Sequence, residues 1–127
     1  MATELNHTIV WCRDQAKSAN LLAEILGLPA PARFGPFHVV ALDNGVSLDF
    51  LETEGEIASQ HYAFLIGEDD FDRVLERIRT RDLAYWADPG KTRRNQINRN
   101  DGGKGLYFED PDGHLLEVLT RPYGSGG

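Results

Sequence analysis

The sequence predicts an α+β fold made of two similar halves, each with the order β-α-β-β-β. Three observations lead to this prediction. The same order of strand-like, helix-like and hairpin-like segments occurs twice within 127 residues. A histidine, His7 or His61, opens the first strand of each half, and an acidic residue, Asp49 or Glu117, lies in each last strand. Because few residues are identical between the halves, the repeat is inferred from the shared order of elements.

The first half begins with a run rich in β-branched and aromatic residues, which is typical of a strand. Apolar residues at positions i, i+3, i+4 and i+7 then predict an amphipathic helix, which Asp14 is placed to cap and Gly27 to end. A tight turn at 43–45 joins two further strand-like runs. The elements expected in this half are a strand at 7–12, the helix between Asp14 and Gly27, a weak strand at 31–35, and strands at 37–42 and 46–51.

The second half repeats this order after a polar linker, 53–60. We expect the acidic residues 68–70 to cap its helix, whose apolar stripe begins at Phe71. A polar loop at 88–103 is long enough to be functional or mobile. The elements expected are strands at 61–66, 83–87, 106–109 and 114–120, with module one at about 5–52, module two at about 61–121 and a flexible Gly/Ser-rich tail at 122–127.

Composition removes several classes of function. A net charge of −7 and a pI near 5.0 disfavour nucleic acid and anionic membranes as partners. The single cysteine, Cys12, excludes an intramolecular disulfide and a multi-cysteine metal site. No apolar run approaches the ~20 residues that span a bilayer, and no signal peptide is visible. We therefore expect a cytoplasmic domain that acts on a small molecule.

Strand parity groups the candidate metal ligands, because residues i and i+2 share one face of a strand. Asp49 and Glu117 each lie among apolar neighbours, where an unpaired carboxylate would cost several kcal/mol to bury. Each should therefore face solvent or a cation, and a twofold relation between the halves would bring them together with His7 and His61. Two imidazoles and a carboxylate suit divalent iron, manganese, nickel, cobalt or zinc. Taken singly, each residue has an ordinary surface or core interpretation.

These histidines, together with the stretch YFEDPDGHLLE at 107–117, resemble the vicinal oxygen chelate superfamily. That superfamily includes glyoxalase I, bleomycin-resistance proteins, fosfomycin-resistance thiol transferases and extradiol dioxygenases, and the resemblance covers about residues 5–121. It implies paired βαβββ modules that form a cupped, open barrel-like mixed sheet around a divalent metal, with the helices outside. It also implies a homodimer, often with modules exchanged between subunits.

The resemblance implies that His7, His61 and Glu117 are the metal ligands. Asp49 matches a fourth ligand of glyoxalase I, but its side chain is one methylene shorter than glutamate. Metal–oxygen bonds tolerate only about 0.2 Å of variation. Asp49 is therefore expected to act through a water molecule or by supporting another ligand.

The resemblance further implies that the metal chelates adjacent oxygens of a substrate and stabilises the negative charge that develops on them. An apolar lining favours an aromatic or hydrophobic substrate over a phosphonate such as fosfomycin. Ile9 also occupies the position at which the fosfomycin enzymes carry a hydroxyl-bearing residue, so that subfamily ranks low. The expected lining comprises Ile9, Trp11, Leu51, Ala63, Leu65 and Leu119.

Three functions stay open on the sequence. Extradiol-type oxygenation, slightly favoured, needs an acid or base, for which His38 and Tyr107 are candidates beside Glu117. Glyoxalase-type lyase or isomerase chemistry would use Glu117 as the proton shuttle. A binding protein for an antibiotic or metabolite would use the pocket without turnover. Arg94 lies in a basic stretch that could hold an anionic group or simply be solvated.

Overall fold

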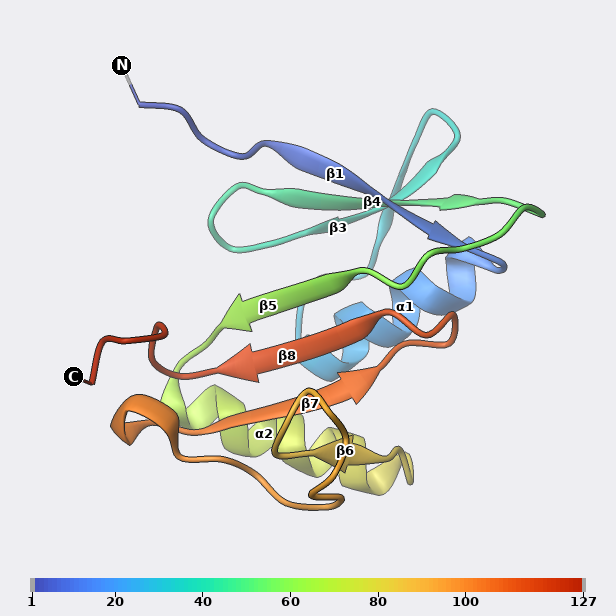
Figure 1. Ribbon diagram of the computed structural model, residues 1–127. Helices are drawn as coiled ribbons and strands as arrows, with labels where there is room; N and C mark the ends of the chain where they lie inside the picture. Colours follow the sequence, from blue (N-terminus) through green and yellow to red (C-terminus); the bar gives the residue numbers. More distant parts are fainter. Residues whose placement is uncertain (1, 127) are drawn as a thin grey trace. The chain divides into compact units, whose positions relative to one another are not determined.

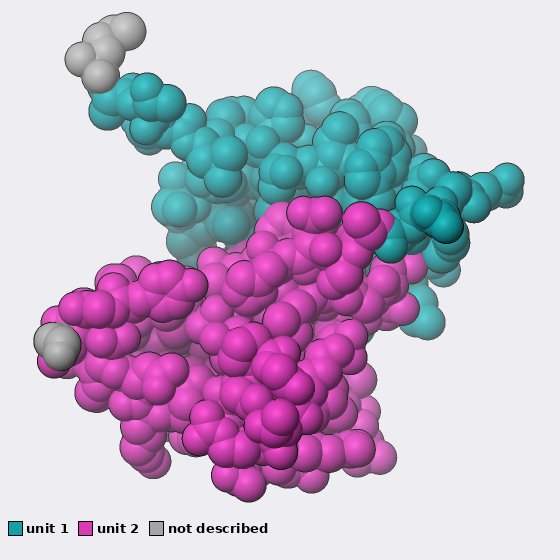
Figure 2. Space-filling view, in the orientation of Figure 1, with its two compact units in different colours: residues 1–57 teal, residues 58–127 magenta. Residues whose placement is uncertain are grey.

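The computed structural model describes residues 2–126, and these divide into two compact units on either side of the boundary between Ile57 and Ala58 (Figures 1 and 2). The division falls inside the polar linker that the sequence places between the modules. Unit 1 contains β1 (His7–Cys12), α1 (Gln15–Leu26), β2 (Ala32–Phe34), β3 (Phe37–Ala41) and β4 (Ser47–Glu52). Unit 2 contains β5 (His61–Leu65), α2 (Glu68–Thr80), β6 (Tyr85–Trp86), a 3₁₀ turn (Asn100–Gly102), β7 (Gly105–Glu109) and β8 (Leu115–Leu119).

The two units have the same topology. The strand order is β1-β4-β3-β2 in one sheet and β5-β8-β7-β6 in the other. In each sheet the first strand of the unit pairs in parallel with the last, and the remaining pairs are antiparallel. The predicted α+β fold, with two tandem βαβββ modules and mixed sheets, is therefore confirmed. Among residues 2–126, no helix has the length and apolar character needed to cross a membrane.

Local sequence signals explain where the helices begin and end. The Asp14 side chain accepts a hydrogen bond from the Lys17 backbone N–H at 3.1 Å and so caps α1. Gly27 adopts φ 70° at the other end, a left-handed conformation that glycine reaches without strain. The expectation that acidic residues cap α2 was wrong in detail. Gly67 is the N-cap, and residues 68–70 instead fill the first turn, where their charge favours the helix dipole.

Each sheet buries the face that packs against its own helix. In unit 2 the stripe that begins at Phe71 on α2 is buried together with alternate residues of the strands. Parity then places the intervening residues on the opposite face, which we call the helix-distal face. In unit 2 this face carries His61, Ala63, Leu65, Tyr107, Leu115, Glu117 and Leu119.

The loop after β6 and the C-terminal tail are both hydrogen-bonded. The Asp88 carboxylate accepts bonds from the backbone N–H groups of Thr92 and Arg93. At the chain end, Ser125 N–H donates to the Pro122 carbonyl at 3.1 Å, and Gly126 N–H donates to Asp101 Oδ1 at 3.2 Å. The structure therefore gives the tail, which the sequence predicts to be flexible, defined contacts with the 3₁₀ turn.

Candidate metal centre

The strand register places a histidine and a carboxylate together in each unit. In unit 1, Ile9 of β1 lies opposite Asp49 of β4, so His7 shares the face of Asp49. In unit 2, Ala63 of β5 lies opposite Glu117 of β8, so His61 shares the face of Glu117. In each unit, the residue that lies opposite the carboxylate follows the histidine by two positions in the same strand. The repeat inferred from the sequence is thus also a repeat of register.

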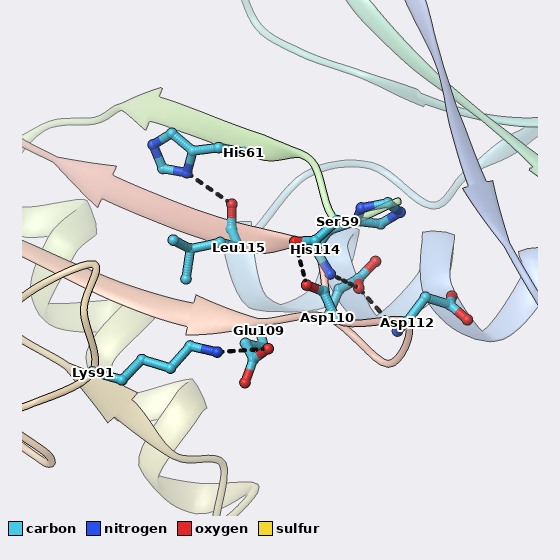
Figure 3. Close-up of polar contacts among 9 residues, drawn as sticks. Ser59, His61, Lys91, Glu109, Asp110, Asp112, His114 and Leu115 are labelled. Carbon is cyan, nitrogen blue, oxygen red and sulfur yellow. Dashed lines mark hydrogen bonds and ion pairs between the residues drawn. The ribbon is translucent and has the colours of Figure 1, made fainter. Parts of the chain in front are cut away.

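In unit 2 the histidine and the carboxylate are in contact. His61 Nε2 lies 3.2 Å from Glu117 Oε1. Figure 3 shows the second contact of this ring, in which His61 Nδ1 lies 2.9 Å from the Leu115 carbonyl oxygen. Since a carbonyl oxygen only accepts hydrogen bonds, Nδ1 carries the proton. The Nε2 atom of a neutral His61 therefore presents a lone pair to the carboxylate.

Two lone pairs that face each other at this distance need a positive group between them. A proton on Nε2 or a bound cation would satisfy both atoms. Two ligands of one divalent ion, each about 2.0–2.2 Å from it, lie roughly 3.0–3.4 Å apart. The 3.2 Å separation of His61 Nε2 and Glu117 Oε1 lies within that range, and a backbone bond on the opposite ring nitrogen is the usual support of a metal-binding histidine. This part of the site therefore fits a divalent metal.

Tyr107 supports the Glu117 carboxylate. It lies opposite Glu117 in the β7–β8 ladder, and its ring stacks on His61 with centroids 6.0 Å apart. Burial, followed by the charge of Glu117 and a hydrogen bond to it, raises the pKa of Tyr107 to about 12. The phenol therefore stays protonated near neutral pH, where it can donate a hydrogen bond but cannot act as a base.

The turn in the YFEDPDGHLLE stretch fixes the start of β5 on β8. Asp110 Oδ1 accepts hydrogen bonds from the backbone N–H groups of Asp112 and His114, each at 2.9 Å (Figure 3). The buried His114 ring in turn accepts the Gln60 N–H at Nδ1, 3.0 Å away. Because Gln60 precedes His61, these bonds help to hold His61 opposite Leu115. His114 is thus a structural residue.

Unit 1 holds its candidate ligands differently. His7 is exposed and its Nδ1 lies 2.7 Å from Asn6 Oδ1, while Asp49 Oδ1 accepts a hydrogen bond from Ser47 Oγ at 2.9 Å. The shorter Asp49 side chain is therefore bonded within its own strand. Within residues 2–126, neither unit by itself gathers three or more His, Cys, Asp or Glu side chains in a metal-binding group. A complete site needs donors beyond His61 and Glu117.

The remaining predicted site residues are His38, Arg94 and the residues of the expected pocket lining. His38 pairs with the buried Phe50 on the helix side of its sheet, and its Nδ1 lies 2.7 Å from Gln15 Nε2, so this placement does not support a catalytic role. Arg94 is exposed in a bridge to Trp86. The predicted pocket residues lie on the helix-distal faces, exposed at Ile9, Trp11, Ala63 and Leu65 and partly buried at Leu51 and Leu119.

A small open hollow, with a cavity volume of about 40 Å³, lies beside Glu117 and Tyr107 in unit 2. Most of its lining was missed by the sequence prediction, because it comes from the polar loop and the tail, which have no periodicity to interpret. The length of the 88–103 loop was the one signal that pointed to it. The lining comprises Asn98, Asn100, Asp101, Lys104, Tyr107, Glu117, Leu119, Arg121 and Tyr123.

Each of the two tandem βαβββ units thus carries a histidine and a carboxylate on its helix-distal face. The chain belongs to the glyoxalase/bleomycin resistance protein/dioxygenase superfamily, whose model matches residues 4–118. The resemblance noted in the sequence is thereby confirmed.

Several known proteins are similar to this chain. The structure of oxidase ChaP-H1 shares 60% identity, covers 97% of this chain and 99% of its own, and superposes with a TM-score of 0.95. Oxidase ChaP-H2 shares 59% identity over 100% of both chains, with a TM-score of 0.97. Glutathione transferase FosA of Serratia marcescens is 31% identical over 124 residues, 93% of this chain and 81% of that protein. The fosfomycin resistance protein FosX of Mesorhizobium loti, at 22% identity and a TM-score of 0.70, shares the fold.

The contact between Tyr107 and Glu117 predicts an unusual tyrosine titration. Wild-type protein should contain a phenol, absent from Tyr107→Phe, that ionises near pH 12 rather than near the ordinary 10.0. Because its pKa is raised on folding, the protonated Tyr107 phenol stabilises the folded protein. This stabilisation is fully present below pH 10 and is lost as the pH rises through the pKa of the folded state, about 12. Glu117→Gln should lower this pKa but leave it above 10, because burial is the largest cause. Absorbance titration of tyrosinate in the three proteins checks this, and a phenol that ionises at the ordinary pH would contradict it.

Proposed function

We propose that this chain is a metal-dependent oxidase that binds an apolar or aromatic small molecule through two adjacent oxygens. The observation that carries the proposal is the His61–Glu117 pair, in which Nε2 faces a carboxylate oxygen at 3.2 Å with Nδ1 committed to the Leu115 carbonyl. Such a pair on an accessible face of a sheet is a metal-binding element ready to receive further donors.

Each residue of the proposed site has a separate role. His61 and Glu117 would hold the ion, and His7 of the other unit would supply a third donor, with Asp49 in a supporting position. When bound, a divalent ion supplies electrophilic stabilisation of negative charge on adjacent substrate oxygens. Tyr107 orients Glu117 through its hydrogen bond and keeps its own proton near neutral pH. Iron or manganese suits oxidation; nickel, cobalt and zinc remain alternatives.

Two lines of support favour oxidation over the other reactions of the superfamily. Two proteins named oxidase share about 60% identity with this chain over nearly its full length, about twice the identity of the FosA relative. In addition, Trp11 and Leu65, exposed by 44% and 61%, lie on the helix-distal faces and suit an apolar or aromatic substrate. These residues offer no charge for a phosphonate.

Thiol transfer is the second candidate, because the glutathione transferase FosA is 31% identical over most of this chain. Extradiol-type ring cleavage is itself an oxidation and so belongs to the first candidate function.

Glyoxalase-type isomerisation would instead require Glu117 to move a proton. A non-catalytic binding protein would require neither an oxidant nor a thiol.

Substitution of the two paired side chains tests the metal site. His61→Ala and Glu117→Gln should each weaken binding of Mn²⁺ and Zn²⁺ by about 100-fold or more, because each removes a direct donor. His7→Ala should weaken it as well. Isothermal titration and elemental analysis of protein purified without chelator measure these effects.

Matched controls separate loss of a ligand from loss of the fold. Glu109→Gln removes a carboxylate from β7 of the same unit, where it pairs with Lys91 at 3.0 Å, and should leave metal affinity unchanged. His38→Gln should also leave it unchanged. Wild-type affinity in both His61→Ala and Glu117→Gln would contradict the assignment of these ligands.

Assays with oxygen and assays with glutathione, the co-reactants of the two candidate reactions, test the reaction class. Iron- or manganese-loaded protein should consume oxygen with at least one member of a panel of catechols and fused aromatic diols, and His61→Ala should abolish this. Glutathione should not be consumed with fosfomycin. Thiol consumption without oxygen uptake would instead establish transfer, and binding of an aromatic diol without either reaction would favour sequestration.

Homodimer formation is a further expectation, since the sheet edges and the exposed apolar residues Ile9, Trp11 and Leu65 need a partner surface. A dimer would also allow His7 of a partner subunit to complete the site. Sedimentation equilibrium at micromolar concentration should give the mass of two chains. A clean monomer would contradict the dimer and with it any exchange of modules.

A further inference from the structure

The hollow beside Glu117 has an outer wall that the metal ligands do not use. Its inner wall is Tyr107, Glu117 and Leu119, all on the helix-distal face of unit 2. Its outer wall is made by the 3₁₀ turn at 100–102 and by the chain after β8, which contributes Arg121 and Tyr123. We refer to residues 121–126 as the C-terminal arm.

Two glycines seat the Arg121 side chain. A Cβ atom at Gly103 would lie 2.9 Å from Arg121 Cγ and 2.5 Å from Thr120 Oγ1, distances that real Cβ atoms do not adopt. A Cβ atom at Gly102 would lie 3.5 Å from Arg121 Nη1. The Arg121 side chain therefore lies along the bare backbone of this loop, and a larger residue at 103 would displace it. Gly102 and Gly103 therefore leave the space in which the Arg121 guanidinium lies beside the hollow.

Hydrogen bonds fix the rest of the C-terminal arm. The Ser125 N–H bond to the Pro122 carbonyl closes a turn around Tyr123 and Gly124, and Gly124 adopts φ 74°. The Gly126 N–H bond to Asp101 Oδ1 then ties the arm to the 3₁₀ turn. Between these contacts Tyr123 remains 75% exposed, yet it lines the hollow. An exposed ring in that position offers a flat surface for stacking.

The charges around the hollow distinguish its two cations. Lys104 Nζ lies 3.0 Å from Asp72 and 3.6 Å from Glu68, both on α2, so its charge is already paired. Arg121 is exposed, and among residues 2–126 no carboxylate lies within ion-pair distance of its guanidinium. Arg121 is therefore the cation that an anionic group entering the hollow would meet, through the bidentate geometry that guanidinium offers a carboxylate.

We propose that the C-terminal arm is a substrate-binding element: Tyr123 stacks on an aromatic ring and Arg121 pairs with an anionic oxygen group on that ring. This inference rests on the proposed function, in that the oxygens held near Glu117 would be at the opposite end of the same molecule. It assigns the substrate to the class of aromatic acids or ionised polyphenols. Arg121 and Tyr123 determine specificity and have no part in metal binding.

The test uses 2-naphthoate, an aromatic carboxylate, with metal-free full-length protein. Isothermal titration or NMR should detect saturable binding that Tyr123→Ala and Arg121→Gln each weaken by about tenfold. Tyr123→Phe should bind as wild type does. Phe34→Ala, which truncates a ring of the same 75% exposure in unit 1, is the matched control and should have no effect. The neutral analogue 2-naphthylmethanol should lose no affinity in Arg121→Gln.

The outcomes separate this inference from the proposed function. Absence of naphthoate binding, or equal binding by wild type, Tyr123→Ala and Arg121→Gln, would overturn the role of the C-terminal arm even in a protein that binds metal and consumes oxygen. Conversely, naphthoate binding that depends on Tyr123 and Arg121 in a protein without metal affinity would support the role of the arm and refute the oxidase. All variants lie at exposed positions, so the fold should survive them.

Discussion

The hydrogen bond from His61 Nδ1 to the Leu115 carbonyl determines what the site can do. It orients the imidazole ring so that Nε2 points at Glu117 Oε1, 3.2 Å away. This bond depends on the parallel register of β5 and β8, in which His61 lies opposite Leu115. The register in turn is supported by the turn at 110–114. A short chain of backbone contacts thus fixes the orientation of this strand histidine toward Glu117.

The two units differ in the contacts that their carboxylates make. Both units place a histidine and a carboxylate in the same register, but Asp49 is bonded to Ser47 within β4, whereas Glu117 reaches the imidazole of the neighbouring strand. Glu117 is also buried and receives a hydrogen bond from Tyr107. In unit 2 the histidine and the carboxylate therefore contact each other, whereas in unit 1 His7 contacts Asn6 and Asp49 accepts a hydrogen bond from Ser47. A repeat of one fold has produced two unequal halves.

Periodicity in the sequence was sufficient for most of the fold and for selecting His61 and Glu117 as candidates, but their direct contact depends on the pairing of β5 with β8, which only the structure shows. Alternation in the strands placed both residues on one face, and the glycine and aspartate signals located the ends of α1. The outer wall of the hollow could not be predicted from periodicity. Arg121 and Tyr123 are positioned by a 3₁₀ turn and by contacts between residues far apart in the loop and the tail. His38 was misleading for a related reason: its face depends on pairing with Phe50, which the sequence did not settle.

The most direct measurement of the central claim is anomalous scattering from crystals of the manganese- or iron-loaded protein. We expect an anomalous peak bonded to His61 Nε2 and Glu117 Oε1, with the Leu115 carbonyl still bound to Nδ1 and a histidine of a first module, His7, as a further ligand. A fully occupied metal at any other position, with the His61–Glu117 contact unchanged, would contradict it.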